Sequence, residues 1–437
     1  MNIIEQFSGV DHAAQLRASR ARSRALTRDL SGAQLMGPRL PIVNPFLWEL
    51  GHIAWFQERW CLRWRGEGAL ADSVLPGADA LYDSAAIAHD LRWDLPVPGL
   101  EATLAYQDRV LDLVQERMRR ESGDPEFAYF AQLAAFHEDM HAEAFHYMRQ
   151  TLGYAAPQLQ GGDANSAADG DAVPAADGDA CIAGGRYLLG AGRATGFVFD
   201  NEKWEHPVDI RPFRIARCCV DNAQYLQFVE DQGYLRPELW SEAGWRWLRQ
   251  GGAQAPRYWR KHEGSWQLRR FATWLPLPLR EPVTHVNWHE AQAYCRFAGR
   301  RLPSEAEWEI AASCAGGGAK RRYPWGDAPP EAQHANLEGD APAAVDGLPR
   351  GDSAHGCRQL IGNVWEWTDS TFTPYPGFVP DPYKEYSAPW FGTHKVLRGG
   401  SFSTPARLIR NTWRNFYTPE RYDIFAGFRT CANESRS

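Results

Sequence analysis

Apolar residues recur every three or four positions along the first third of the chain. This spacing places them on one face of an α-helix, and it continues through four segments, at residues 13–30, 44–64, 100–120 and 126–152. Long helices that each carry one apolar face bury it by packing against one another. The pattern therefore predicts a four-helix bundle over residues 1–157.

The pattern changes after a stretch without aromatic residues. Residues 158–180 (QLQGGDANSAADGDAVPAADGDA) consist mainly of Ala, Gly and Asp, so they cannot bury enough apolar surface to fold by themselves. Beyond them, Gly, Pro and Trp separate short apolar segments such as GGRYLLG and KVLRGGSF, and helical spacing returns at 222–231 and 288–299. We expect a flexible linker at 158–180 and a second, loop-rich domain over 181–437, which makes the chain α+β overall.

Length and charge limit the class of protein. A chain of 437 residues exceeds what one hydrophobic core usually serves, in agreement with two domains. The net charge of −7 gives no general attraction to nucleic acid, and Lys and Arg form no basic stripe. No apolar run is long enough to cross a membrane, and the N-terminus lacks a signal-peptide pattern. We expect a soluble, cytoplasmic protein that acts on small molecules and binds neither nucleic acid nor membrane.

Cysteine and tryptophan usage adds two expectations. The eight cysteines form no CxxC pair and no dense framework, which indicates reduced, mostly buried thiols. Of the 19 tryptophans, 14 follow residue 200. The second domain should therefore be rich in aromatic packing.

The segment HEDMH, His137 to His141, is the first candidate for chemistry. Two histidines four residues apart lie on one face of a helix and can bind one cation together. In an HExxH metallopeptidase, Glu138 is the general base. The longer metzincin motif needs Gly and His where this chain has Ala144 and Tyr147. A zinc peptidase, a pair of surface histidines and a different metal site all remain open from this pattern.

A third metal ligand is available on another predicted helix. His52 lies in ELGHIAWF, and bundles build metal sites from inward side chains of different helices. The alternative is a core histidine that bonds a backbone carbonyl. His146 is excluded because nine residues after His137 amount to about 900° of helical rotation, the opposite side of the helix. Three imidazoles suit zinc with one water and also iron(II) with open positions, and the spacing does not choose between them.

Several motifs carry a resemblance to known families. The N-terminal half resembles the DinB-type bundle, and the C-terminal half resembles the formylglycine-generating-enzyme fold, a relative of C-type lectins. The motifs of the second half are PVTHVNWHEAQAYCRFAGRRLPSEAEWEIAA (282–312), YPWGD (323–327), LIGNVWEWT (360–368), VLRGGSF (396–402) and FAGFR (425–429). Together with GHIxWF and HExxH, this pairing resembles the ergothioneine-type sulfoxide synthases. These are non-heme iron enzymes that use oxygen to join a sulfur or selenium donor to the imidazole of hercynine, trimethylated histidine.

The resemblance implies a cofactor and a catalytic side chain. His52, His137 and His141 would hold iron(II), with O2 as co-substrate. A tyrosine of the YxxY segment in DPYKEYSAPWFG would deliver a proton or an electron, and Tyr383 is the best match, with Tyr386 as its neighbour. A phenol suits this role because it is a weak acid that can also lose a hydrogen atom. Packing is the alternative role for either ring.

Departures from the family pattern concern the donor. Relatives that accept γ-glutamylcysteine typically follow Arg-Asn with Trp-Asp, whereas Asn415 is followed here by Phe416 and Tyr417. The loop of the bundle offers Arg92 without an arginine cluster, and Met140 replaces an amide inside the HxxxH pair. We expect these five residues to contact substrates. An uncharged donor then fits better, because unpaired charges in a cleft are costly. The selenosugar of the selenoneine synthase variant is predicted, and the alternative is a sulfoxide synthase that uses γ-glutamylcysteine or cysteine.

Two other classes fit less well. A true formylglycine-generating enzyme resembles this second half but needs a pair of copper-binding cysteines near the C-terminus, where only Cys431 occurs. A non-catalytic, lectin-like binding module would explain the second domain but leave the three histidines without a role.

Overall fold

The computed structural model describes residues 10–66, 68–121, 123–159, 178–193, 195–314 and 320–433. The chain divides into two compact units, one of Met1–Gln160 with Ala194–Phe197 and the other of Gly161–Arg193 with Val198–Ser437. Most of the linker predicted at 158–180 lies at 160–177, outside the described residues. The last two residues of that range already belong to the first strand.

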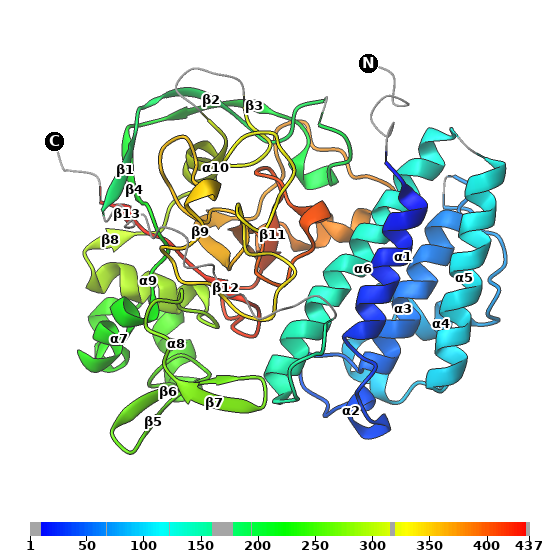
Figure 1. The fold of residues 1–437 in the computed structure, drawn as a ribbon, viewed down its shortest axis with the longest axis horizontal. Helices are drawn as coiled ribbons and strands as arrows, with labels where there is room; N and C mark the ends of the chain where they lie inside the picture. The colour runs from blue at the N-terminus through cyan, green and yellow to red at the C-terminus, as the bar shows by residue number, and fades with distance from the viewer. Residues whose placement is uncertain are drawn as a thin grey trace. The chain divides into compact units, whose positions relative to one another are not determined.

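The first unit is helical, as the apolar spacing predicts (Figure 1). Helix α3 packs against both α5 and α6, and α1 packs against α6. The long helices are α1 (His12–Ala25), α3 (Phe46–Glu58), α5 (Leu100–Arg120) and α6 (Pro125–Leu152), and the short elements are α2 (Gly32–Met36), the π-helical turn η2 (Arg59–Arg63), α4 (Ala78–Tyr82) and the 3-10 turn η3 (His89–Trp93).

Helix α6 has well-defined ends. The Asp124 side chain accepts a hydrogen bond from Glu126 N at 3.0 Å, and Pro125 occupies the first helical position, where no backbone N–H is needed. Gly153 ends the helix in the left-handed conformation, at φ 67°, which costs glycine little. These signals fix the register of α6, and with it the direction in which each histidine points.

The second unit combines small sheets with short helices (Figure 1). Two four-stranded sheets have the orders β1-β4-β13-β8 and β11-β10-β9-β12, and β2-β3 and β5-β6-β7 form antiparallel ribbons. The strands are β1 (Asp179–Ile182), β2 (Gly185–Leu189), β3 (His206–Ile210), β4 (Phe213–Ala216), β5 (Trp259–His262), β6 (Ser265–Arg270), β7 (Thr273–Pro276), β8 (Arg300–Arg301), β9 (Trp365–Thr371), β10 (Lys395–Arg398), β11 (Asn415–Tyr417), β12 (Ala426–Gly427) and β13 (Cys431–Ala432). The longer helices are α7 (Asn222–Glu230), α8 (Glu242–Gly251), α9 (Trp288–Phe297) and α10 (Glu305–Ser313). The α+β prediction is confirmed, and α8 and α10 add to the two helices expected here.

Buried ion pairs tie the second unit together. Arg398, on β10, donates to Glu305 Oε1 at 2.9 Å and also bonds Glu309, both on α10. Arg414 donates to Glu305 through Nε at 2.7 Å and through Nη2 at 3.0 Å. All four side chains are buried. These pairs hold α10, β10 and Arg414 in fixed positions, because breaking one pair would leave an uncompensated buried charge.

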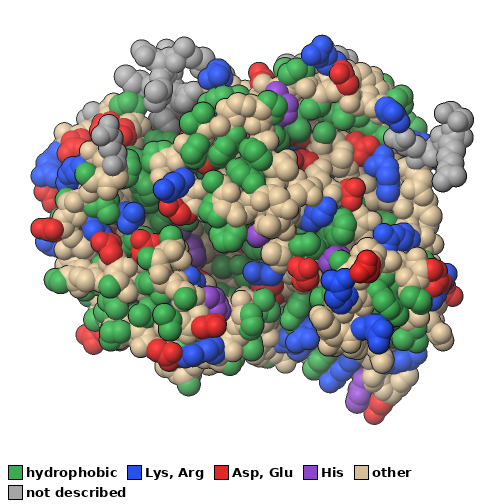
Figure 2. Space-filling model, turned by 180° about the vertical axis from the view of Figure 1, so that it is seen from behind, with side chains coloured by type: hydrophobic (Ala, Val, Ile, Leu, Met, Phe, Trp, Pro, Cys, Tyr) green, Lys and Arg blue, Asp and Glu red, His purple; other side chains and the backbone are tan. Residues whose placement is uncertain are grey.

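Charges are mixed on the surface that can be seen in Figure 2. Lys and Arg side chains alternate there with Asp and Glu, and they do not merge into a continuous basic stripe on this face. Among the described residues, no helix is both long and apolar enough to cross a bilayer.

Candidate metal centre

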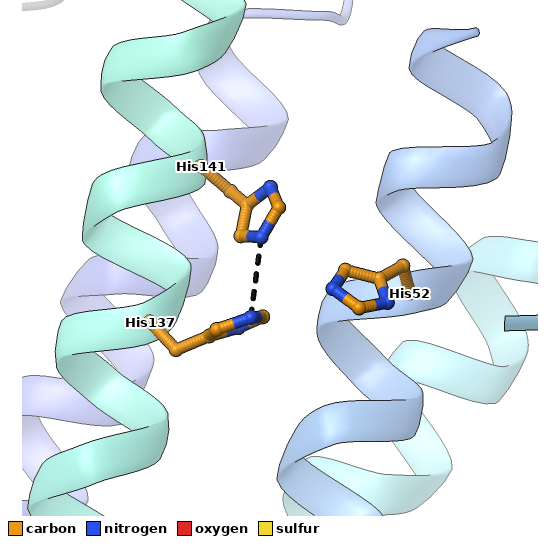
Figure 3. Close-up of side chains that lie close together, drawn as sticks. All are labelled: His52, His137 and His141. Carbon is orange, nitrogen blue, oxygen red and sulfur yellow. Dashed lines mark hydrogen bonds between the residues drawn. The ribbon is translucent and has the colours of Figure 1, made fainter. Parts of the chain in front are cut away.

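Three histidines meet between α3 and α6 (Figure 3). His52 projects from α3, and His137 and His141 project from one face of α6 toward it. One ring nitrogen from each lies within 4.8 Å of the other two. The three residues that the sequence singled out are therefore brought together, including the distant His52.

His52 is oriented by its own surroundings. Its Nδ1 lies 2.8 Å from the backbone oxygen of Tyr82, which fixes the hydrogen on Nδ1 and leaves the lone pair on Nε2. A Cβ at position 51 would lie 2.3 Å from Tyr82 Cε1. Only glycine lets the Tyr82 ring lie this close to α3. On the other side, the Trp48 ring stacks on His52 with centroids 4.9 Å apart and planes at 11°.

The rest of the GHIxWF motif supports the same cluster. Phe56 stacks directly on His137, with ring centroids 3.6 Å apart and planes at 5°. Trp55 lies beside His52 and donates from Nε1 to Asp79 Oδ1 at 2.6 Å. Trp55 and Phe56 of the motif therefore each pack against a ligand ring.

Glu49 was not predicted from the sequence. Its Oε2 contacts His141 Nδ1, and its Oε1 accepts from Asn44 Nδ2 at 2.5 Å. The carboxylate side chain is 3% exposed. Carboxylates that hold the second nitrogen of a metal-binding histidine fix the tautomer and make the ring a better ligand. The signal was available, since an acidic residue three positions before His52 shares its side of α3.

The pKa values of His52 and His137 are shifted toward the neutral ring. Burial, with a contribution from the neighbouring His141, lowers the pKa of His52 to about 3. Burial also lowers the pKa of His137 well below its usual value. For Glu49, burial alone would raise the pKa, but His141, His52 and Asn44 together bring it down to about 2. At neutral pH His52 and His137 thus present uncharged rings near the ionised Glu49 carboxylate, and neutral imidazoles are the form that binds a divalent cation.

The nitrogen spacing fits a single cation. His137 Nε2 and His141 Nε2 are 3.2 Å apart. Two ligands about 2.1 Å from one ion, at roughly 90–110° to each other, are separated by about 3.0–3.4 Å. Without a cation, one of these nitrogens must carry a hydrogen that it donates to the other. Iron(II) and zinc both accept imidazole ligands of this kind.

Glu138 does not serve the cluster. Arg20 Nε and Ser23 Oγ, both on α1, donate to Glu138 Oε1 at 2.8 and 2.6 Å. The carboxylate is buried in the bundle core and faces α1, whereas the histidines face α3. The general base that a zinc peptidase would need is therefore absent from this position beside the histidines.

The structure also places three other residues of the first unit that the sequence analysis discussed. Arg92 donates to Asn44 Oδ1 at 2.8 Å, and its guanidinium carbon lies 4.2 Å from the centroid of the Trp48 ring. Met140 is half-buried on α6 beside His141. His146 is fully buried on α6 and stands outside the three-histidine cluster, as its helical angle predicts.

The remaining predicted residues gather in the second unit. Tyr383 precedes the turn η8 (Lys384–Tyr386), and Asn415, Phe416 and Tyr417 form β11. The ring of Tyr386 lies 6.2 Å from that of Tyr383 and 5.7 Å from that of Phe416. Burial raises the pKa of Tyr386. The Tyr417 ring lies 4.9 Å from the guanidinium carbon of Arg421.

Two polar anchors that the sequence did not suggest hold the segment with both tyrosines. At one end, Lys203 Nζ donates to both oxygens of Asp381 at 2.7 Å. At the other, Ser387 Oγ donates to Asp200 Oδ1 at 2.5 Å and accepts from Asn201 Nδ2 at 2.9 Å. Burial raises the pKa of Asp200 to about 6. Residues 381–387 are thus fixed at both ends.

Comparison with known proteins identifies both halves. Residues 15–145 match the DinB superfamily, and residues 165–434 match the sulfatase-modifying factor enzyme 1-like domain. The hercynine oxygenase of Mycobacterium tuberculosis is 39% identical over 94% of this chain and 96% of its own length. That of Mycolicibacterium smegmatis is 37% identical over 95% of this chain and 97% of its own. The formylglycine-generating enzyme of Streptomyces coelicolor is 35% identical, over 58% of this chain and 88% of its own length.

The chain belongs to the hercynine oxygenase family, a family of oxidative enzymes. The predicted family and its two-part fold are confirmed. The hercynine oxygenase relatives act on a small molecule by name.

Gly51→Ala should destabilise the first unit and weaken metal binding. The added Cβ would collide with the Tyr82 ring, whose backbone oxygen orients His52, and overpacking of this kind costs about 1–3 kcal/mol. Gly32→Ala is the matched control, because no described atom lies within 4 Å of the added group. Urea unfolding and cobalt(II) titration measure the two effects. Equal stability of both variants would contradict the proposed close approach.

Proposed function

We propose that this protein is an iron(II)- and O2-dependent enzyme that joins a sulfur or selenium donor to C2 of the hercynine imidazole. The proposal is carried by the cluster of His52, His137 and His141, found in a chain similar to hercynine oxygenases over nearly its whole length. Coupling a thiol or selenol to the C2–H with one O2 gives an oxidised chalcogen and one water. The reaction needs no external reductant.

The three histidines would hold the iron through their Nε2 atoms. When bound, iron(II) supplies the one-electron chemistry that dioxygen requires and leaves positions open for small ligands. The chain itself fixes two of the ligand rings, because the Tyr82 carbonyl holds Nδ1 of His52 and the Glu49 carboxylate holds Nδ1 of His141. Aromatic faces in the tryptophan-rich chain suit the trimethylammonium group of hercynine, which makes no hydrogen bonds.

Tyr383 is the proposed donor of a proton or hydrogen atom. It lies at the start of η8 and is half-buried. Tyr386 packs between other rings, at 4.4 Å from Phe199 and 5.7 Å from Phe416. A packed ring suits a supporting role, so Tyr386 would position its neighbour.

The identity of the donor has two candidates. The full-length relatives favour a thiol of the ergothioneine type, such as γ-glutamylcysteine or cysteine. A specific observation favours a selenosugar, because Phe416 and Tyr417 present rings where a carboxylate would receive the ammonium of the dipeptide. Arg421, beside Tyr417, is already paired with Asp423 at 2.7 Å.

His52→Ala should remove most bound iron and activity, because two imidazoles hold a divalent ion poorly. His146→Ala is the control, since it removes another buried histidine of the same bundle that lies outside the cluster. Iron content of the purified proteins, measured after anaerobic loading, checks the result. Full iron occupancy in His52→Ala would refute the assignment.

Tyr383→Phe should retain iron and hercynine binding but slow bond formation or divert the oxygen chemistry, because it removes the transferable hydrogen and keeps the ring. Tyr386→Phe is the matched control and should affect the rate less. Single-turnover product analysis under O2 distinguishes them. An unchanged rate and product for Tyr383→Phe would leave that residue a packing role only.

A competition assay decides the donor. With hercynine, iron(II) and O2 present, 1-selenoglucose, its thio analogue and γ-glutamylcysteine are supplied at equal concentration. If the pocket lacks a partner for the ammonium, the sugar should win by at least about tenfold, since 1.4 kcal/mol already gives that factor. Tyr417→Asp should then improve the relative standing of the dipeptide. A win for γ-glutamylcysteine identifies the enzyme as an ergothioneine-type sulfoxide synthase.

A further inference from the structure

Arg92 is predicted from the sequence to contact a substrate, but its hydrogen bonds point inward. Its Nη1 donates to Asn44 Oδ1 at 2.8 Å, and its Nη2 lies 3.4 Å from the backbone oxygen of Ser84. The guanidinium also stacks on Trp48, at 4.2 Å from the ring centroid. Arg92 is thereby connected to His52, because the Trp48 ring on which it stacks lies in turn against the His52 ring.

A chain of polar contacts leads from Arg92 to the metal cluster. Asn44 Nδ2 donates to Glu49 Oε1 at 2.5 Å, and Glu49 Oε2 contacts His141 Nδ1. His141 Nε2, on the far side of the ring, faces His137 Nε2 at 3.2 Å. Two side chains, Asn44 and Glu49, thus connect the guanidinium of Arg92 to the His141 ring.

The two charged groups, Arg92 and Glu49, set the direction of the bonds in this chain. A guanidinium can only donate, so it requires the Asn44 oxygen on its side and turns the Asn44 amide nitrogen toward Glu49. A carboxylate can only accept, so its second oxygen requires a hydrogen on His141 Nδ1. With that hydrogen in place, His141 Nε2 carries a lone pair toward the cluster.

We infer that Arg92 is a positioning residue of the metal centre: through Asn44 it orients Glu49, the carboxylate that holds a hydrogen on His141 Nδ1. This inference rests on the proposed function only in taking the three histidines as metal ligands. Arg92, Asn44 and Glu49 touch neither hercynine nor donor in this role. Their substitution therefore changes metal affinity in the absence of any substrate.

The test is anaerobic titration of the full-length metal-free protein with iron(II) or cobalt(II), without substrates. Glu49→Gln should lower affinity about 10–100-fold, the usual effect of losing a carboxylate behind a ligand histidine. Asn44→Ala and Arg92→Met should lower it by a smaller factor of the same sign. In a double-mutant cycle, Arg92→Met should add little to Glu49→Gln, because both interrupt one chain.

Two controls separate this role from general damage. Glu58→Gln makes the same change in another buried carboxylate of α3, which bonds Tyr106 and Ser73. Arg39→Met removes an arginine that pairs with Asp94 and lies 5.7 Å from the centroid of the Trp93 ring. Both should leave metal affinity unchanged. Nitrogen-15 shifts of the histidine rings provide a second readout, and the wild type should show His141 with hydrogen on Nδ1.

The outcomes distinguish the inference from the proposed function. Wild-type metal affinity in both Asn44→Ala and Arg92→Met, or fully additive effects in the cycle, would overturn the inference. A raised KM for the donor with unchanged metal affinity would return Arg92 to substrate binding and overturn it as well. If the variants lose affinity as expected while the wild type fails to convert hercynine, the inference stands and the proposed reaction fails.

Discussion

Two buried imidazole rings and a half-buried third, gathered in one helix bundle, impose a condition that the rest of the first unit must satisfy. Burial keeps rings such as His52 and His137 neutral, and it also leaves ring nitrogens without water as a partner. The Tyr82 carbonyl and the Glu49 carboxylate meet this need for His52 and His141. Tyr82 can approach only because position 51 is glycine. The packing of α3 is thus determined by the chemistry of the cluster as much as by apolar burial.

In the second unit, buried charged groups rather than ring nitrogens need partners. Glu305 receives both Arg398 and Arg414 in a buried network. Arg414 immediately precedes β11, so this network fixes where Phe416 and Tyr417 stand. Phe416 stacks on Phe372 with ring centroids 4.0 Å apart. The side chains proposed to discriminate donors therefore lie on a rigid base.

The sequence predicted those features that depend on local spacing. Helical periodicity located the four long helices, and the interval of four placed His137 and His141 on one face. Glu49 could have been suspected from its place three positions before His52, but its contact with His141, like the bond of Asn44 to Glu49, depends on how the chain packs. The role of Arg92 could not be predicted for the same reason, because nothing in the residues around it indicates that it stacks on Trp48. In the second unit, the ribbon β5-β6-β7 gave no clear alternation.

One aromatic contact bears on how this protein can be divided. Phe197 belongs to the first compact unit, where its ring lies 5.3 Å from that of Tyr129 and 5.2 Å from that of Phe136, next to His137. In sequence, however, Phe197 follows β1 and β2 of the second unit. A fragment that ends before residue 180 therefore contains all three histidines but lacks one of the rings that cover α6. Gene fusions or exchanges made at the apparent boundary would therefore remove an aromatic ring that packs against α6.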